Sequence, residues 1–204
     1  MKKKKIHIVG WKTGDNSFGV TVPYYEFFSQ FGEVTILSPG QFVETDLLVL
    51  PGGLDVDTAR YGEVPSLNTS NSNVILEYFD KNILPKYIDS NTKIFGICRG
   101  LQTLNVYFGG NLTQNLIYHE YSSTSRDQRV HELIATDTSM RVKEHFFKRN
   151  GKYKVNSLHH QSVDVLGKDL VCMFKSEDGI IEGIMHTEKP IAAVQYHPKV
   201  LGLC

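Results

Sequence analysis

The stretch KIFGICRGLQTLNVYFGG, residues 93–110, limits the fold of this chain more than any other. Its first six residues form a nearly continuous apolar run, which is typical of a strand buried on both faces of a parallel sheet. The residues that follow have apolar side chains at helical spacing and end at paired glycines, which predicts a helix over 99–110. A strand that runs directly into a helix is the start of a βαβ unit, so a parallel sheet with helices packed against it is expected.

The same alternation extends over the first half of the chain. Strands are predicted at 5–10, 33–38, 46–53 and 93–98, and helices at 24–32, 73–90 and 99–110, with an interruption at Pro85. Beyond residue 128 the pattern changes to consecutive strands joined by turns, at 129–136, 152–158, 170–176, 179–187 and 190–197. The sequence therefore predicts an α/β fold with a mixed, mostly parallel sheet flanked by helices, in a single domain over residues 1–204.

Composition narrows the classes of function. Lys plus Arg and Asp plus Glu both number 22, so no net charge favours nucleic acid or an anionic membrane as a partner. No apolar run approaches the ~18 residues of a membrane span, and no signal peptide follows the lysines at 2–5. Cysteines at 98, 172 and 204 give no disulfide framework, so a reduced, cytoplasmic protein is expected. Cys172 is expected in the core, and Cys204 is an incidental terminal thiol.

Residues 96–100, GICRG, place Cys98 between two glycines at the junction of strand and helix. This is the pattern of a nucleophile elbow, a sharp turn that lifts the middle side chain above the sheet. At a helix N-terminus the thiol pKa is expected to fall, and the backbone N–H of Arg99 would face a developing oxyanion. The alternative is an inert buried cysteine at a common type of junction.

A cysteine nucleophile needs a base that is near in space and distant in sequence. His197, in AVQYHPKV, closes the last strong strand, and it reaches the same crevice as Cys98 if the two strands are parallel. His159 and His160, in NSLHHQSV, are rivals. His119 and His131 lie in two His-Glu dipeptides, where surface or hydrogen-bonding roles are favoured over a metal site.

The segment LPGGLDVD, residues 50–57, contains a tight turn after a buried strand. Its N–H groups would face the same crevice and could supply a second oxyanion donor.

Taken in order, the motifs LPGGLDVD, GICRGLQTLNVYFGG, NSLHHQSV, EGI and AVQYHP resemble the class I glutamine amidotransferase-like superfamily. Within it they look most like the γ-glutamyl hydrolase branch, the peptidase C26 group. The resemblance covers about residues 46–198. It implies a flavodoxin-like α/β core, a Cys-His-Glu triad, and hydrolysis of a γ-glutamyl amide through a glutamyl thioester, with no cofactor and no metal.

The resemblance also assigns roles to residues. Cys98 matches the nucleophile, His197 the general base, and Gly53 (or Gly52) and Arg99 the backbone donors of the oxyanion hole. The positions that match the glutamyl-binding side of the pocket are Gln102, Ser157, His159, His160 and Gln161, with Asp55 at a further recurring position grouped with them.

The chain departs from the family pattern at Lys199. The family reads His-Pro-Glu, whereas this chain reads His197-Pro198-Lys199, so a lysine stands where the triad acid is usual. A lysine there is expected to lower the pKa of the histidine. We expect it to turn to solvent, with Glu182 or Glu188 orienting the ring. The chain also ends seven residues after His197, where the family usually continues into a helix. Either another subunit covers that face or the sequence is shortened.

Three functions are consistent with these motifs. The first is a γ-glutamyl hydrolase whose leaving group is a small amine, a folate polyglutamate or a nucleotide-linked amidate, such as a γ-glutamyl-CDP-amidate of surface-polysaccharide synthesis. The second is a glutaminase subunit that delivers ammonia to a synthase partner. The third is a binding protein weakened in catalysis by Lys199. A small γ-glutamyl compound is the expected ligand, and a homodimer or a synthase complex the expected assembly.

Overall fold

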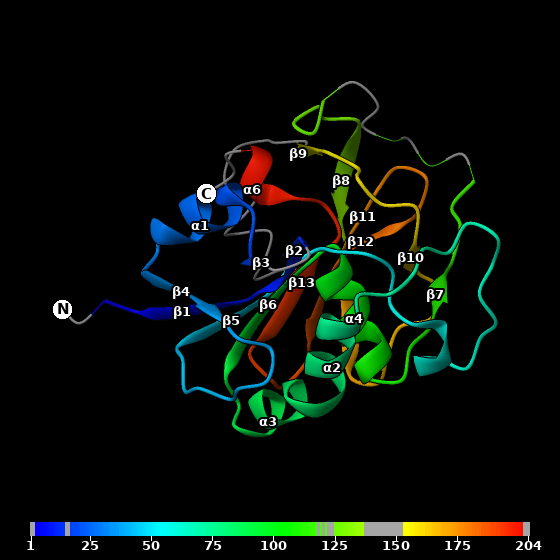
Figure 1. Ribbon diagram of the computed structural model, residues 1–204. Coiled ribbons are helices and arrows are strands. Elements are labelled where there is room, and N and C mark those ends of the chain that lie inside the picture. The colour runs from blue at the N-terminus through cyan, green and yellow to red at the C-terminus, as the bar shows by residue number, and fades with distance from the viewer. Residues whose placement is uncertain are drawn as a thin grey trace.

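The computed structural model describes residues 3–14, 17–117, 119, 121, 125–136 and 153–201. Within these residues, nine strands form one sheet in the order β4-β1-β5-β6-β13-β12-β11-β8-β9 (Figure 1). Neighbouring strands are parallel from β4 to β13 and antiparallel from β13 to β9. The expected mixed sheet with an antiparallel extension is therefore confirmed.

The sheet has a parallel half and an antiparallel half. The parallel half contains β4 (Glu33–Leu37), β1 (Lys5–Val9), β5 (Leu47–Leu50), β6 (Lys93–Ile97) and β13 (Ile191–Val194). The antiparallel half contains β12 (Ile181–His186), β11 (Leu170–Lys175), β8 (His131–Ala135) and β9 (Tyr153–Val155).

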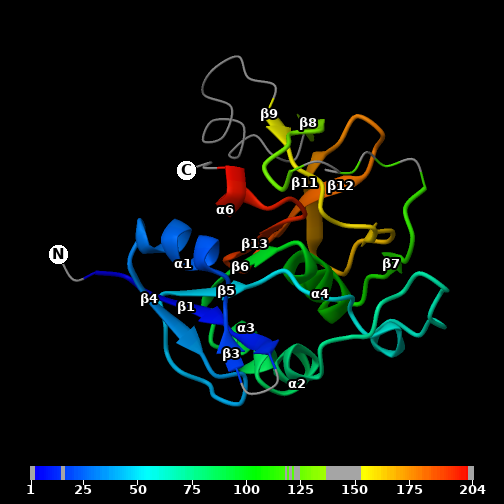
Figure 2. The same cartoon turned by 45° about the horizontal axis from the view of Figure 1, so that its top comes forward.

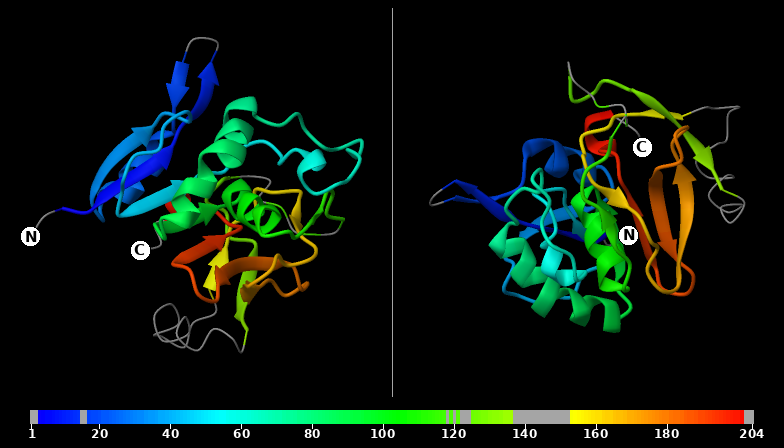
Figure 3. Two further views of the ribbon diagram at one scale, coloured as in Figure 1. Left: turned by 90° about the horizontal axis from the view of Figure 1, so that it is seen from below. Right: turned by 90° about the vertical axis from the view of Figure 1, so that its right-hand side faces the viewer.

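Helices cover both faces of the sheet. One face carries α2 (Val74–Asn82), α3 (Leu84–Asp89) and α4 (Arg99–Tyr107), and the other carries α1 (Val22–Ser29) and α6 (Pro198–Leu201). Figures 2 and 3 show α1 on the opposite side of the sheet from α2 and α3. Each helical layer has its own apolar core against the strands, so the central strands are buried on both sides. Among the described residues, no helix has the length and apolar character that a membrane span requires.

Most predicted elements are present, mostly with shorter bounds, although α1 begins at Val22, before the predicted start at 24. The helix expected over 73–90 divides at Ile83 into α2 and α3, with Pro85 in the first turn of α3, as the interruption predicted. Cys172 is only partly buried, because it packs at the margin of the core, and Cys204 lies outside the described residues.

Several short elements are not anticipated by the sequence pattern. They are the hairpin β2 (Trp11–Gly14) and β3 (Ser17–Gly19), the pair β7 (Leu112–Thr113) and β10 (Ser162–Val163), and the 3₁₀ turn η1 (Thr58–Arg60). Elements of two to four residues are too short to show a periodicity.

The pairing of β6 with β13 positions the site. The two strands are parallel, with Ile97 opposite Val194, and the N–H of Cys98 donates to the carbonyl of Val194 at 2.8 Å. The condition under which His197 reaches the crevice of Cys98 is therefore met, and both residues leave the sheet at the same edge.

Candidate active site

A pocket of about 620 Å³ lies at the carboxyl ends of β5, β6 and β13. It brings together Cys98, His197 and Lys199 with the turn at Gly52 and Gly53. The remaining described residues that line it are Trp11, Lys12, Thr21, Tyr24, Leu54, Asn73, Tyr121, Ser125, Arg126 and Leu158.

The backbone at Cys98 has the strained conformation of a nucleophile elbow. Its φ is 54° and its ψ is −108°, a combination that few residues other than glycine adopt. A Cβ on Gly100 would lie 2.4 Å from the carbonyl oxygen of Leu50, and one on Gly96 would lie 2.7 Å from the Gly100 carbonyl carbon. Both glycines are therefore required by close backbone contact.

The Cys98 thiol is buried beside the N-terminus of α4. Burial raises the pKa of the thiol to about 11, although the charge of Lys199 and the backbone N–H of Arg99 each lower it. The expected fall in thiol pKa is therefore wrong for the free site, because desolvation outweighs the favourable contacts. The thiol is protonated at neutral pH and needs a base before it can attack a carbonyl.

The side chain of Arg99 turns away from the pocket. Its guanidinium lies 2.9 Å from Asp80 and 2.5 Å from Glu77, both on α2, and all three groups are buried or nearly so. This ion pair fixes the first turn of α4. As a result, Arg99 presents only its backbone N–H to the sulfur of Cys98.

The base side of the site consists of His197 and Lys199. The Nζ of Lys199 lies 2.6 Å from Nδ1 of His197 and 3.7 Å from the ring centroid of Tyr24. Burial and the nearby charge of Lys199 hold the pKa of His197 well below its ordinary value. Burial also lowers the pKa of Lys199 to about 7.

This geometry overturns two expectations. Lys199 does not turn to solvent, because its amine contacts the imidazole of His197 directly. Glu182 and Glu188 do not orient that ring: Glu182 faces His131 and His159, and Glu188 lies at the turn after β12.

Asn156 and Tyr24 belong to the site although sequence reasoning missed them. The Oδ1 of Asn156 accepts the N–H of His197 at 2.8 Å, and its Nδ2 donates to the carbonyl of Arg126 at 2.8 Å. The hydroxyl of Tyr24 accepts the N–H of Gly52 at 2.6 Å. Asn156 directly precedes Ser157 in the quoted NSLHHQSV motif and could have been found there, whereas nothing in the sequence distinguishes Tyr24.

Comparison with known proteins identifies the family. The sequence model of peptidase C26 matches residues 38–199. A protein of Lactococcus lactis named as the glutamine amidotransferase-like protein YvdE is 34% identical over 190 residues, which cover 86% of this chain and 78% of that protein. The chain belongs to the peptidase C26 family. It is thereby a member of the class I glutamine amidotransferase-like superfamily.

A further sequence match agrees with this family, and a solved structure shows the same fold. One subunit of the glutamine-hydrolyzing GMP synthase of Pyrococcus abyssi is 30% identical over 137 residues, covering 67% of this chain and 62% of that one. The crystal structure of a glutamine amidotransferase from Thermotoga maritima aligns with a TM-score of 0.63 over 98% of this chain and 77% of that one, at 14% identity. The likeness of structure confirms the expected fold, and the names of the relatives support a glutamine amidotransferase-type hydrolase.

In this C26 chain the two glycines of the PGG turn are not equivalent. The N–H of Gly52 is engaged by Tyr24, whereas the N–H of Gly53 has no acceptor among the described residues. A Cβ on Gly52 would lie 2.9 Å from Cε1 of His197 and 3.4 Å from Cβ of Cys98. The absence of a side chain at Gly52 therefore leaves space between the thiol of Cys98 and the imidazole of His197. The backbone N–H of Gly53 is left available as a hydrogen-bond donor.

The six residues matched to the glutamyl side are not among the described residues that line the 620 Å³ pocket. Gln102, buried, donates to the carbonyl of Gln161 at 3.1 Å and approaches Oε1 of Gln195 at 3.3 Å. Ser157 and the amide of Gln161 are also buried.

The two other candidate bases, His159 and His160, contact groups outside the pocket. His160 approaches Asp55 at 3.0 Å, and Asp55 in turn accepts the N–H of Ser70 at 2.7 Å. The Nδ1 of His159 contacts the carbonyl of Gln161 at 3.0 Å, while its Nε2 faces Glu182. His197 is therefore the one histidine among the described residues that lines the pocket with Cys98.

Proposed function

We propose that this protein hydrolyses a γ-glutamyl amide through a glutamyl thioester on Cys98. The observation that carries the proposal is the strained, glycine-flanked cysteine at a helix N-terminus, in one pocket with a neutral histidine. The free N–H of Gly53 and the N–H of Arg99 are the donors for the oxyanion. The residues matched to the glutamyl side would position the glutamyl group through the segment around Leu158, which lines the pocket; they are Gln102, Ser157, His159, His160, Gln161 and Asp55.

Lys199 serves as the terminal base of a proton relay in this proposal. Above pH 7 its amine is largely neutral and accepts a hydrogen bond from Nδ1–H of His197, which leaves Nε2 free to accept a proton. When the thiol of Cys98 attacks the γ-carbonyl, its proton passes to Nε2, and the Nδ1 proton passes to Lys199. The imidazole remains neutral throughout, as its burial demands, and the new ammonium is stabilised over the ring of Tyr24.

The relay then runs in reverse. The Nε2 proton protonates the leaving nitrogen as the C–N bond breaks, and Lys199 returns a proton to Nδ1. In the second half, water gives a proton to Nε2 as the Nδ1 proton again passes to Lys199, and the resulting hydroxide adds to the thioester carbonyl. Collapse expels the sulfur of Cys98, which regains its proton from Nε2 as Lys199 returns a proton to Nδ1, and glutamate leaves.

The charge of the pocket favours an anionic leaving group. Lys12 and Arg126 line it as cations, and no Asp or Glu does so among the described residues. A cationic amine would be repelled there, whereas a phosphate or carboxylate on the leaving side would be attracted. This supports a nucleotide-linked amidate, such as a γ-glutamyl-CDP-amidate, or a γ-linked polyglutamate over a polyamine.

A substrate series tests both the thioester route through Cys98 and the preference for an anionic leaving group. Glutamate release is measured from γ-glutamyl compounds with phosphate-bearing, carboxylate-bearing, neutral and cationic leaving groups, and from glutamine. We expect the anionic substrates to be turned over fastest, and a glutamyl adduct on Cys98 in quenched reactions. Cys98→Ala should reduce turnover about 10⁴-fold or more, whereas the matched control Cys172→Ala should not change it.

Two outcomes would contradict the proposal. Turnover that persists in Cys98→Ala excludes the thioester route. Turnover that appears only in Lys199→Glu, with none in the wild type on any γ-glutamyl amide, means that the natural chain is not a working hydrolase.

The second candidate is a glutaminase component of a synthase, which the similarity to part of a glutamine-hydrolyzing GMP synthase favours. It requires glutamine to be the best substrate and a synthase partner to accept the ammonia. A free chain that hydrolyses glutamine faster than every other γ-glutamyl amide would establish it in place of the hydrolase.

A further inference from the structure

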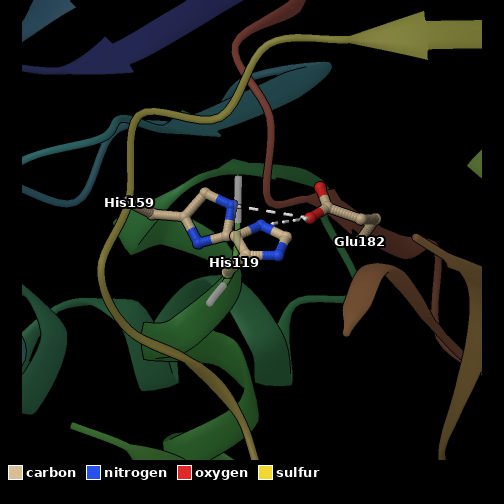
Figure 4. A group of neighbouring side chains, drawn as sticks. All are labelled: His119, His159 and Glu182. Carbon is tan, nitrogen blue, oxygen red and sulfur yellow. Dashed lines mark ion pairs between the residues drawn. The ribbon is translucent and has the colours of Figure 1, made fainter. Parts of the chain in front are cut away.

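Four side chains meet in a buried cluster outside the pocket: His119, His131, His159 and Glu182, here called the histidine–glutamate cluster. Their Nε2 atoms approach one carboxylate oxygen, Oε1 of Glu182, at 3.7 Å from His119, 3.2 Å from His131 and 3.4 Å from His159. Figure 4 shows the rings of His119 and His159 converging on Glu182. The carboxylate of Glu182 is fully buried on β12, and the other three come from separate segments of the chain.

The facing atoms of the cluster lack hydrogen-bond partners. The three Nε2 atoms and both carboxylate oxygens are buried, and none has a partner with hydrogen-bond geometry among the described residues. Buried polar atoms are nearly always satisfied, and each unsatisfied one costs about 1–3 kcal/mol. Five such atoms at one place therefore require an explanation beyond packing.

Contacts on the far side of two rings fix which nitrogen carries the proton. The Nδ1 of His159 lies 3.0 Å from the carbonyl of Gln161, and the Nδ1 of His119 lies 2.7 Å from Oδ2 of Asp178. Both oxygens can only accept, so each Nδ1 carries hydrogen and each neutral ring presents the lone pair of Nε2 to the cluster. Two lone pairs and a carboxylate then face one another with no hydrogen between them, and a cation relieves that repulsion.

This is the arrangement of histidines that bind a metal. Such histidines donate Nδ1–H to a carboxylate or a backbone carbonyl and coordinate through Nε2.

We propose that the histidine–glutamate cluster binds one divalent zinc ion through Nε2 of His119 and His159 and Oε1 of Glu182, with Nε2 of His131 as the fourth ligand. The ligand atoms of the first three all lie within 4.8 Å of one another. Zinc bonds of about 2.1 Å in tetrahedral geometry place neighbouring ligand atoms about 3.4 Å apart, close to the separations from Glu182. Imidazole-rich sets suit zinc, and four protein ligands make a closed, structural site.

The zinc would tie the wall of the pocket to the antiparallel half of the sheet. His131 and Glu182 lie on β8 and β12, whereas His159 lies between Leu158, which lines the pocket, and Gln161, which holds Gln102. The metal takes no part in the proton relay. The metal site shares His159 with the residues matched to the glutamyl side, but its ligands touch neither Cys98 nor His197 in any hydrogen bond or ion pair between described residues, and metal content tests it without an activity measurement.

Metal analysis of the whole chain, purified without a metal-affinity tag, tests the site directly. We expect about one zinc per chain. After removal of zinc with a chelator, the melting temperature should fall, and added zinc should restore it. Cobalt should replace zinc and give the visible absorption of a tetrahedral ion with nitrogen ligands.

Variants separate the metal site from a metal-free cluster. Glu182→Gln should lose the zinc, and Asp178→Asn, which alters only the partner of His119, should weaken zinc binding about 10-fold. The control His7→Gln changes another buried histidine with an unpartnered ring nitrogen and should keep the full metal content. Wild-type chain that takes up neither zinc nor cobalt and shows no change in melting temperature overturns the proposal, as does equal zinc binding with and without Glu182.

Discussion

The two sides of the candidate site are built in different ways. On the nucleophile side, backbone contacts place Cys98: glycines at 96 and 100 pack against neighbouring main chain with no room for a side chain. On the base side, side-chain contacts place His197, chiefly a 2.6 Å contact with Lys199 and a hydrogen bond to Asn156. A position fixed by backbone tolerates almost no change, whereas a position fixed by side chains can change its chemistry while the fold remains.

The largest expected effect is on the nucleophile side. Gly100→Ala forces a methyl group to within 2.4 Å of the Leu50 carbonyl oxygen, so β5 and α4 must separate. We expect a loss of about 3 kcal/mol in the free energy of unfolding, and a fall of about 100-fold in kcat/KM from displacement of Cys98. Chemical denaturation and initial rates measure both.

Gly40→Ala is the matched control, since a Cβ there meets nothing within 4 Å. If Gly100→Ala were as stable and as active as this control, the backbone would not determine the nucleophile side.

The next effect concerns Lys199 and is a change of pH dependence. Because burial lowers the pKa of Lys199 to about 7, the relay predicts that kcat/KM rises as the pH increases through about 7 and is lost below it. Lys199→Met removes the terminal base and should reduce kcat about 100-fold. The fall of kcat/KM at low pH, the acid limb of the pH–rate profile, should then move below pH 6.5, to the pKa of His197. An acid limb that stays at pH 7 in the methionine variant excludes Lys199 as its origin.

The same lysine should affect stability as well as rate. The unfolded chain keeps a Lys199 pKa near 10.5, so between about pH 7 and 10.5 it binds more protons than the folded chain. The free energy of unfolding therefore rises with pH over this window. Lys199→Met should be more stable than the wild type at pH 7, and the difference should shrink toward pH 10.5, as measured by denaturation at each pH.

Asn156 gives a smaller effect, because it acts on the backbone of His197 rather than on the ring. Asn156→Ala removes the acceptor of the His197 N–H and the donor to the carbonyl of Arg126. We expect a loss of about 1–3 kcal/mol in stability and a fall of about 10-fold in kcat, without a shift of the acid limb. A shifted limb would mean that Asn156 governs the protonation of His197.

The same contrast explains what could be predicted from the sequence. The strand-to-helix junction at Cys98 follows from an apolar run and glycine spacing, which are local properties. The sequence interpretation has the parallel relation of β6 and β13 only as a condition, because strand pairing joins residues that are distant in the sequence. The predicted position of Lys199 is wrong, because whether a long amine turns to solvent depends on the aromatic face of Tyr24, which lies far away in the sequence. The convergence of three histidines on Glu182 likewise depends on which strands pair. Elements as short as β7 and β10 contain too few residues to show a hydrophobic periodicity in the sequence.

The smallest expected effect lies where the two sides meet, at Tyr24. Its hydroxyl accepts the N–H of Gly52, and its ring lies under the amine of Lys199. Tyr24→Phe keeps the ring and removes only the acceptor, so the pKa of Lys199 and the acid limb should not move. Release of Gly52 should loosen the turn that carries Gly53 and lower kcat less than 10-fold, since one neutral hydrogen bond is worth about 1 kcal/mol. Initial rates across the pH range measure both quantities.

Tyr24→Leu removes the ring as well and has two opposite effects on the pKa of Lys199. Loss of the cation–π contact destabilises the ammonium and lowers this pKa, whereas entry of water beside the amine favours the charged form and raises it. Burial is the largest cause of the depressed lysine pKa, so we expect the second effect to win and the acid limb to move upward. An upward shift in Tyr24→Leu with none in Tyr24→Phe assigns the lysine pKa to exclusion of water by the ring. A downward shift would assign the main effect to the cation–π contact, and no shift in either variant would assign the pKa to the rest of the pocket.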